Sequence, residues 1–251
     1  MTSYTVTGST TNNTFGGGLL KVYVLDNAAL AGTPAVGSST SAYNCSVSTT
    51  QDGSYVFGGV NNETASTSFT ASSGCTITDQ ASINAGGAQG GAFQTTSGTT
   101  GTPGPTTVGS STTFAGNYGV AAMEILASGG SLSVEGGSPA AVTSTSATSF
   151  TTASFTPVSG TLLVAVLVAC GNATGSNTCV ATVSSTPSLA TWTEQVKINA
   201  TAGAVNSYAG VWTAVLAAPV TSGPPLGLQP LVQVPAVVPV ISGWRNAAHS
   251  R

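Results

Sequence analysis

The sequence predicts an all-β protein with two tandem antiparallel β-sandwich domains, of jelly-roll or immunoglobulin-like type, followed by an extended Pro-rich C-terminal arm. Three observations lead to this prediction: apolar residues alternate with a period of two, a long stretch of sequence recurs in the same order, and the last residues mix prolines with aliphatic side chains. The predicted domains are residues 1–104 and residues 105–223, and the arm is residues 224–251.

The period of two is clearest in residues 19–25, LLKVYVL. Leu20, Val22 and Val24 share one face of the expected strand, and Tyr23 lies on the other. Clusters of Ser, Thr, Gly and Asn separate such runs at short spacing, and no long stretch has helical periodicity. About seven or eight strands per domain are expected, which is typical of a sandwich.

The duplication is clearest where TITDQASIN at residues 76–84 recurs as TWTEQVKIN at residues 191–199. Five further segments match in the same order along the chain. They are 4–11 with 106–113, 19–25 with 120–126, 32–36 with 137–142, 51–60 with 158–167, and 90–95 with 208–214. Because chance matches would not fall in order, we interpret the chain as a tandem duplication, joined near the sequence TTGTPGPTT.

The C-terminal arm combines five prolines with aliphatic residues from Leu231 to Ile241. Proline prevents a helix and disfavours a central strand, whereas the aliphatic residues are too apolar for a solvated linker. Such an arm is expected to dock in a groove, either on its own second repeat or on a neighbouring subunit. The predicted docking residues are Leu231, Val234, Val237, Val240, Trp244 and Arg245.

The four cysteines are Cys45, Cys75, Cys170 and Cys179. Cys170 and Cys179 bracket a Gly/Asn-rich loop, so they form a possible hairpin-closing disulfide, and Cys45 with Cys75 form a second possible pair. Free buried thiols are the alternative for each pair. Neither CxxC spacing nor a second imidazole accompanies His249, so no metal site is predicted.

The low charge of the chain excludes several classes of protein. Charged residues make up 4% of the sequence, whereas a soluble domain usually has about 25%. Four Lys and Arg residues in total cannot neutralise a run of phosphates, so nucleic-acid binding is not expected. The longest apolar run, residues 160–170, is about half of the roughly 20 residues that a transmembrane helix needs, so no membrane span is predicted.

Few residues are able to carry chemistry. Seven acidic residues are scattered along the chain and are interpreted as solvent-facing acids on strands, and none of the common hydrolase, metalloprotease or phosphate-binding motifs occurs. We therefore predict a protein that is not an enzyme, with no catalytic residues and no cofactor. Trp192 and Trp212 alternate as core residues do, whereas Tyr23, next to Lys21, is the best candidate for an exposed aromatic residue that binds a glycan.

The segment TTASFTPVSGTLLVAVLVA, followed by ATWTEQVKINA and YAGVWTAVLAAP, resembles repeated β-sandwich units in structural proteins of actinobacterial tailed phages and prophages. The resemblance covers both repeats, about residues 3–220. It implies a virion structural protein, such as a minor tail protein or a capsid-surface component, whose partners are other virion proteins or copies of itself. No secretory signal is recognised at the N-terminus, which fits assembly in the host cytoplasm and release by lysis.

Two alternatives remain open at this stage. The chain could be a carbohydrate-binding adhesin, which would bind cell-surface glycans through exposed aromatic residues. It could also be a secreted cell-surface or filament protein, which would be located outside intact cells.

Overall fold

The structure is a computed structural model. It describes residues 2–10, 15–39, 43–62, 68–83, 89–112, 116, 118–158, 162–172, 180–188, 191–202 and 205–216. The predicted docking residues of the arm, from Leu231 to Arg245, lie outside the described residues, as does Cys179.

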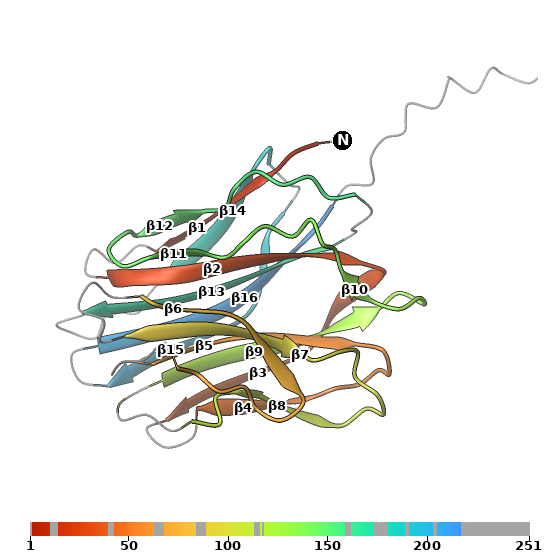
Figure 1. The fold of residues 1–251 in the computed structure, drawn as a ribbon, viewed down its shortest axis with the longest axis horizontal. Coiled ribbons are helices and arrows are strands. Elements are labelled where there is room, and N and C mark those ends of the chain that lie inside the picture. Colours follow the sequence, from red (N-terminus) through yellow and green to blue (C-terminus); the bar gives the residue numbers. More distant parts are fainter. Residues whose placement is uncertain are drawn as a thin grey trace, which may run out of the picture. The chain divides into compact units, whose positions relative to one another are not determined.

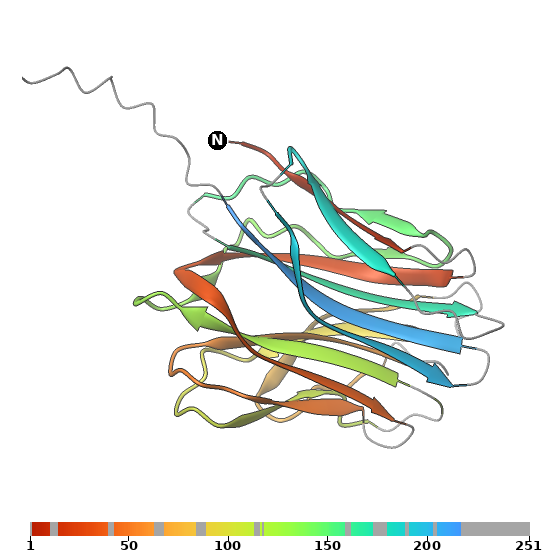
Figure 2. The same cartoon turned by 180° about the vertical axis from the view of Figure 1, so that it is seen from behind.

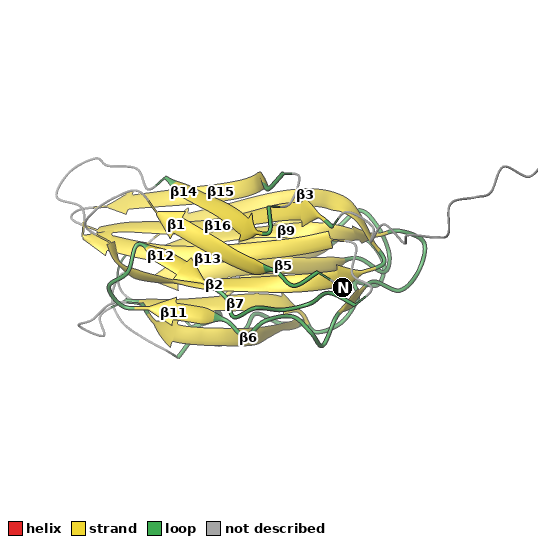
Figure 3. Cartoon of the chain, turned by 90° about the horizontal axis from the view of Figure 1, so that it is seen from above, coloured by secondary structure: helices red, strands yellow, loops and turns green. Residues whose placement is uncertain are grey.

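Within the described residues all regular secondary structure is β-strand, which confirms the predicted all-β class (Figure 3). The first eight strands are β1 (Thr5–Thr10), β2 (Phe15–Asp26), β3 (Ala28–Ser39), β4 (Asn44–Ser48), β5 (Tyr55–Asn62), β6 (Cys75–Ser82), β7 (Gly90–Thr96) and β8 (Pro105–Gly109). The following eight are β9 (Tyr118–Ala127), β10 (Ser133–Val134), β11 (Val142–Ser144), β12 (Ser149–Thr151), β13 (Leu162–Asn172), β14 (Ala181–Thr186), β15 (Thr193–Ala202) and β16 (Val205–Val215).

The strands form four antiparallel sheets. The six-stranded sheet, here called the β13 sheet, has the order β10-β2-β13-β16-β15, and β11 also pairs with β2. The five-stranded sheet, here called the β5 sheet, has the order β3-β9-β5-β7-β6. A three-stranded sheet, β12-β1-β14, and a two-stranded sheet, β4-β8, complete the set.

The sheets stack in layers, with a hydrophobic core between each pair of neighbours (Figure 1). The central core lies between the β13 sheet and the β5 sheet. The two smaller sheets cover the outer faces, with β1 and β12 contributing to one outer core and β4 and β8 to the other. Alternate residues of β2 show the consequence: Leu20 and Val22 enter an outer core, whereas Leu19 and Leu25 enter the central core.

The structure does not divide at residues 104 and 105, and residues 1–219 form one compact unit. β2, from the first predicted repeat, pairs with β13 of the second, from Leu25 opposite Leu162 to Phe15 opposite Gly171. β9, from the second repeat, pairs with β5 of the first. The prediction of two separately folded sandwiches is therefore corrected to one body, because each large sheet contains strands from both repeats.

The duplication itself agrees with the strand order. The order β2-β13-β16-β15 in one large sheet corresponds to β9-β5-β7-β6 in the other. The four corresponding pairs, β2 with β9, β13 with β5, β16 with β7 and β15 with β6, overlap the segments that match in the sequence. The first long strand of each repeat has thus been exchanged into the sheet of the other repeat.

The outer layers show the same exchange. β1, from the first repeat, pairs with β12 and β14 of the second. Its counterpart in the sequence, β8, pairs with β4 of the first repeat, and Ser110 just after β8 forms an isolated bridge with Ala71. The first two strands of the first repeat, β1 and β2, therefore pair with strands of the second repeat. The first two strands of the second repeat, β8 and β9, pair with strands of the first repeat.

Cleavage between the repeats provides a direct test of this exchange. A protease site inserted after Thr102, an exposed residue between β7 and β8, is expected to give two fragments that elute together at the mass of the intact 24.4 kDa chain. The fragments should separate only in denaturant, because β-ladders cross the cut. Elution of two separate folded fragments under native conditions would contradict the exchange, and the uncut variant serves as control.

Candidate functional site

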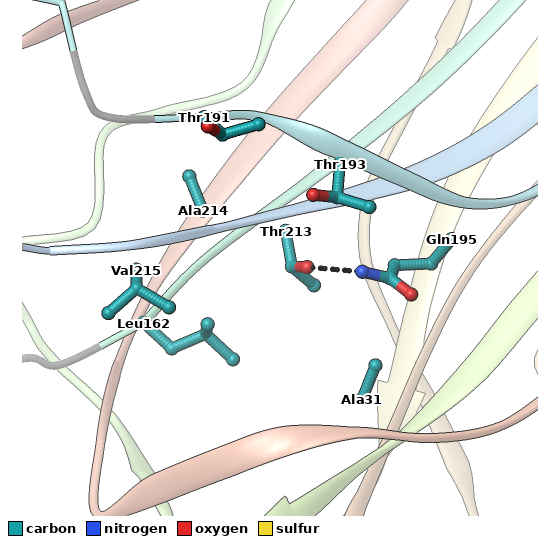
Figure 4. Close-up of a pocket in the computed structure, with 8 residues that line it drawn as sticks. All are labelled: Ala31, Leu162, Thr191, Thr193, Gln195, Thr213, Ala214 and Val215. Carbon is teal, nitrogen blue, oxygen red and sulfur yellow. Dashed lines mark hydrogen bonds between the residues drawn. The ribbon is translucent and has the colours of Figure 1, made fainter.

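One recess in the described residues is a groove of about 470 Å³ where both large sheets end. β15 is an edge strand of the β13 sheet and β3 is an edge strand of the β5 sheet. These two strands are in contact, and Figure 2 views the molecule from the side on which they lie. The groove is lined by Ala31, Leu162, Thr191, Thr193, Gln195, Thr213, Ala214 and Val215 (Figure 4).

The groove has an apolar part and a hydroxyl-bearing part. Leu162, Ala214 and Val215 supply aliphatic surface, and 58% of the surface of Val215 is exposed. In the polar part Gln195 Nε2 donates a hydrogen bond to Thr213 Oγ1 at 2.8 Å. None of the eight lining residues is ionisable. The groove is therefore suited to a neutral, apolar ligand and offers no group for proton transfer.

The local sequence positions these side chains through a β-bulge. The register between β15 and β16 shifts between Glu194 and Val196, so Gln195 is an extra residue opposite β16. A bulge of this kind re-aims the side chain and is common at sheet edges. The neighbouring charges pair with each other, Lys197 Nζ lying 2.8 Å from Glu194 Oε1.

A second recess, of about 720 Å³, lies against the segment that joins the two repeats. It is lined by Thr49, Ser73, Gly74 and residues 96–107. Several of its hydroxyl groups are already used within the fold: Thr49 Oγ1 donates to Gly104 O at 2.9 Å, and Thr100 Oγ1 lies 2.7 Å from Ser54 Oγ. These bonds hold the connecting segment in place.

Glu124 is a buried carboxylate, which corrects the prediction of a solvent-facing acid. The backbone N–H of Thr50 donates to Oε1 at 2.8 Å and that of Gln51 at 3.2 Å, while the Thr50 hydroxyl donates to Oε2 at 2.9 Å. Burial raises the pKa of Glu124, but these hydrogen bonds and one from Ser54 outweigh it and hold the pKa below its usual value. Glu124 thus ties the segment after β4 to β9.

Tyr23 is also buried, with 3% of its surface exposed, so it is not the surface aromatic residue that the sequence suggested. Its hydroxyl lies 2.7 Å from Thr78 Oγ1, and Lys21 Nζ lies 3.2 Å from Asp79 Oδ2. Burial raises the pKa of Tyr23, the nearby charge of Asp79 raises it further, and the bond to Thr78 opposes both. These contacts join β2 to β6 across the two large sheets.

The tryptophans and two of the cysteines also have structural positions. Trp212 is buried in an outer core, which confirms the core prediction for this residue, and Trp192 is partly buried against the same core. Cys45 and Cys75 are free thiols, and burial, followed by the proximity of Cys75, raises the pKa of Cys45 to about 12. The possible Cys170–Cys179 disulfide lies outside the described side chains.

The described residues contain no group of three or more His, Cys, Asp or Glu side chains that could hold a metal ion. Among them there is also no helix that is long and apolar enough to cross a membrane. No protein-family model, curated protein or solved structure matches the chain.

The groove could not have been recognised from the sequence. Its lining residues come from four strands and from Thr191 just before β15, and they are ordinary Thr, Ala, Leu, Val and Gln residues without motif spacing. The one signal that could have pointed to this region is the duplication, because the repeated segments 76–84 and 191–199 coincide with β6 and β15, which are both edge strands.

Glu124→Gln is expected to lower the free energy of unfolding by about 2–3 kcal/mol at pH 7, because a charge-assisted network loses its charge. The folded-state pKa is depressed, so this contribution is present above the unfolded pKa of about 4.3 and is lost as the pH falls through the folded pKa. Denaturant unfolding at pH 7 and at pH 3 measures both effects.

Asp52→Asn is the matched control, since it removes the same charge from an exposed side chain close to the same segment. It should change the free energy of unfolding by less than about 0.5 kcal/mol. Equal effects of the two substitutions would contradict the role assigned to Glu124.

Proposed function

We propose that this chain is a non-enzymatic structural protein of a virion, located in the tail or on the capsid surface. In this proposal the exchanged repeats form a rigid building block, and the C-terminal arm attaches each copy to a neighbouring subunit. The partners are other virion proteins or further copies of the chain. Assembly takes place in the host cytoplasm and release follows lysis.

The strand exchange is the observation that carries the proposal. Separating the repeats would require the β2–β13 and β9–β5 ladders to break together, and both lie in layers buried on their two faces. Such a body is expected to unfold as one cooperative unit rather than repeat by repeat. A passive component of a particle under mechanical stress benefits from this property.

The use of ionisable groups supports the same function. Glu124, Tyr23, Lys21 and Asp79 connect strands or loops that are distant in the sequence, so their chemistry serves the fold. With charged residues at 4% of the sequence, contacts between subunits would depend on apolar burial and neutral hydrogen bonds. Such contacts are little weakened by salt, whereas contacts between exposed charges are screened. The resemblance of residues 3–220 to repeated units of phage structural proteins points in the same direction.

Particle purification tests the proposal. Virions collected from a producing culture on a density gradient should contain the chain, detected by mass spectrometry, and should retain it after a wash in about 1 M salt, which reduces the Debye length to about 3 Å. The chain should be absent from the surface fraction of intact cells. Recovery only from the cell surface or the culture medium, without particles, would contradict the proposal.

Deletion of residues 226–251 tests the arm. Because residues 1–219 form a compact unit, the shortened chain should stay folded and soluble but should no longer enter particles. Unfolding by heat, compared with the full chain, verifies that the body is intact. Undiminished incorporation of the shortened chain would show that the arm is not the anchor.

A further inference from the structure

We propose that residues Leu231–Ile241 of a second copy of this chain bind as an added β-strand along the edge of β15 opposite β16, which pairs with no other described strand, and cover the groove beside it. This inference rests on the proposed function, because it specifies how the arm holds a neighbouring subunit. It names one occupant, the arm of another copy, and one mode of recognition, strand addition.

Two prolines weaken hydrogen bonding along one side of the segment and leave the other side complete. Successive N–H groups of a strand point to opposite sides, so residues two or four apart share a side. Pro235 and Pro239 are four residues apart, and each removes a donor from the same side. The other side keeps the N–H groups of Val232, Val234, Ala236, Val238 and Val240.

A strand of this kind is better suited to a sheet edge than to a position between two strands, because one of its sides has lost two donors. The side chains of the segment are also suited to a sheet edge. The even-numbered residues from 232 to 240 are all Val or Ala and share one face, which gives an unbroken aliphatic surface of moderate size. The segment is therefore suited to end a sheet above an apolar floor.

β15 offers a matching edge. It is ten residues long, and within the described residues it is paired on one side, with β16. Its register with β16 is unbroken from Val196 to Ala202, so this part of the edge is straight enough to accept a partner. The groove at its start supplies the aliphatic surface of Leu162, Ala214 and Val215.

The other long edges are less suitable. β3 is interrupted by two register shifts against β9, between Ala28 and Ala31 and again between Ala31 and Pro34. β6 carries Asp79, which forms the ion pair with Lys21 of the opposite sheet. β15 combines a regular stretch with a neutral groove, and its two charged side chains, Glu194 and Lys197, pair with each other.

The length of the connecting segment permits exchange between copies. The described chain ends at Leu216, directly after Val215 of the groove. Residues 217–230 can span up to about 50 Å when extended. The described chain therefore ends beside the groove, and a connecting segment of this length can reach the equivalent groove of a second copy, so that reciprocal exchange gives a closed dimer.

The full-length chain tests the proposal by proline parity. The double substitution Val234→Pro and Val238→Pro removes two donors from the side that pairs, and should weaken self-association by about 10- to 100-fold. The matched control, Val237→Pro and Ile241→Pro, removes two donors from the opposite side, which already carries Pro235 and Pro239, and should keep most of the affinity. Sedimentation velocity over a range of concentrations measures the dissociation constant of each.

A second pair of variants tests the groove that would receive the arm. Val215→Glu places a charge in the groove and should weaken self-association, whereas Val158→Glu alters another exposed valine, 68% exposed and outside the groove, and should not. Because both valines are exposed, both variants should leave the exchanged body intact, which thermal unfolding checks.

Four outcomes would overturn the inference. A wild-type chain that stays monomeric at every concentration would show that a second copy is not the occupant, as would an arm that protects β15 within one chain. Equal weakening by the two double-proline variants would show apolar contact without strand pairing. Binding of the arm to a protein other than this chain would also show that a second copy is not the occupant. Because purified protein is used, failure here leaves incorporation into particles as a separate test of the function.

Discussion

The pairing of β2 with β13 and of β9 with β5 is the constraint on which the rest of the structure depends. β2 and β9 are each paired along both edges and buried on both faces. Because each comes from one repeat and completes the sheet of the other, the central core cannot form until both repeats are present. The outer layers follow the same exchange through β1 and β8, so the whole body forms one interdependent unit.

The sequence predicted the strands and their equivalence but not the exchange. Matching segments identify which strands correspond, yet a strand makes similar local contacts whether it pairs within its own repeat or with the equivalent strand of the other. The choice depends on the connections. Asn27 alone separates β2 from β3, with a φ of 56°, and a hairpin normally needs at least two loop residues, so the two strands continue into different sheets. The alternating pattern of apolar residues does not show that β2 and β3 belong to different sheets.

The errors at Tyr23 and Glu124 have a related cause. Alternation indicates two faces, and a polar residue on one face suggests a face in contact with water. Here layers cover both faces of each large sheet, so the polar residues find partners that are distant in the sequence: Thr78 for Tyr23, and the backbone of Thr50 and Gln51 for Glu124. The groove escaped prediction because it is assembled from common residues where two sheets end.

The ionisable groups and the layers described above all contribute to one body, on which the proposal of a structural building block rests. Native-state hydrogen exchange tests the central claim most directly, because it reports the free energy of opening for each strand. The account predicts that the amides of β5 and β13, which belong to different repeats, open together with the same free energy and the same dependence on denaturant. Two groups of amides that open independently, divided near residues 104 and 105, would contradict it.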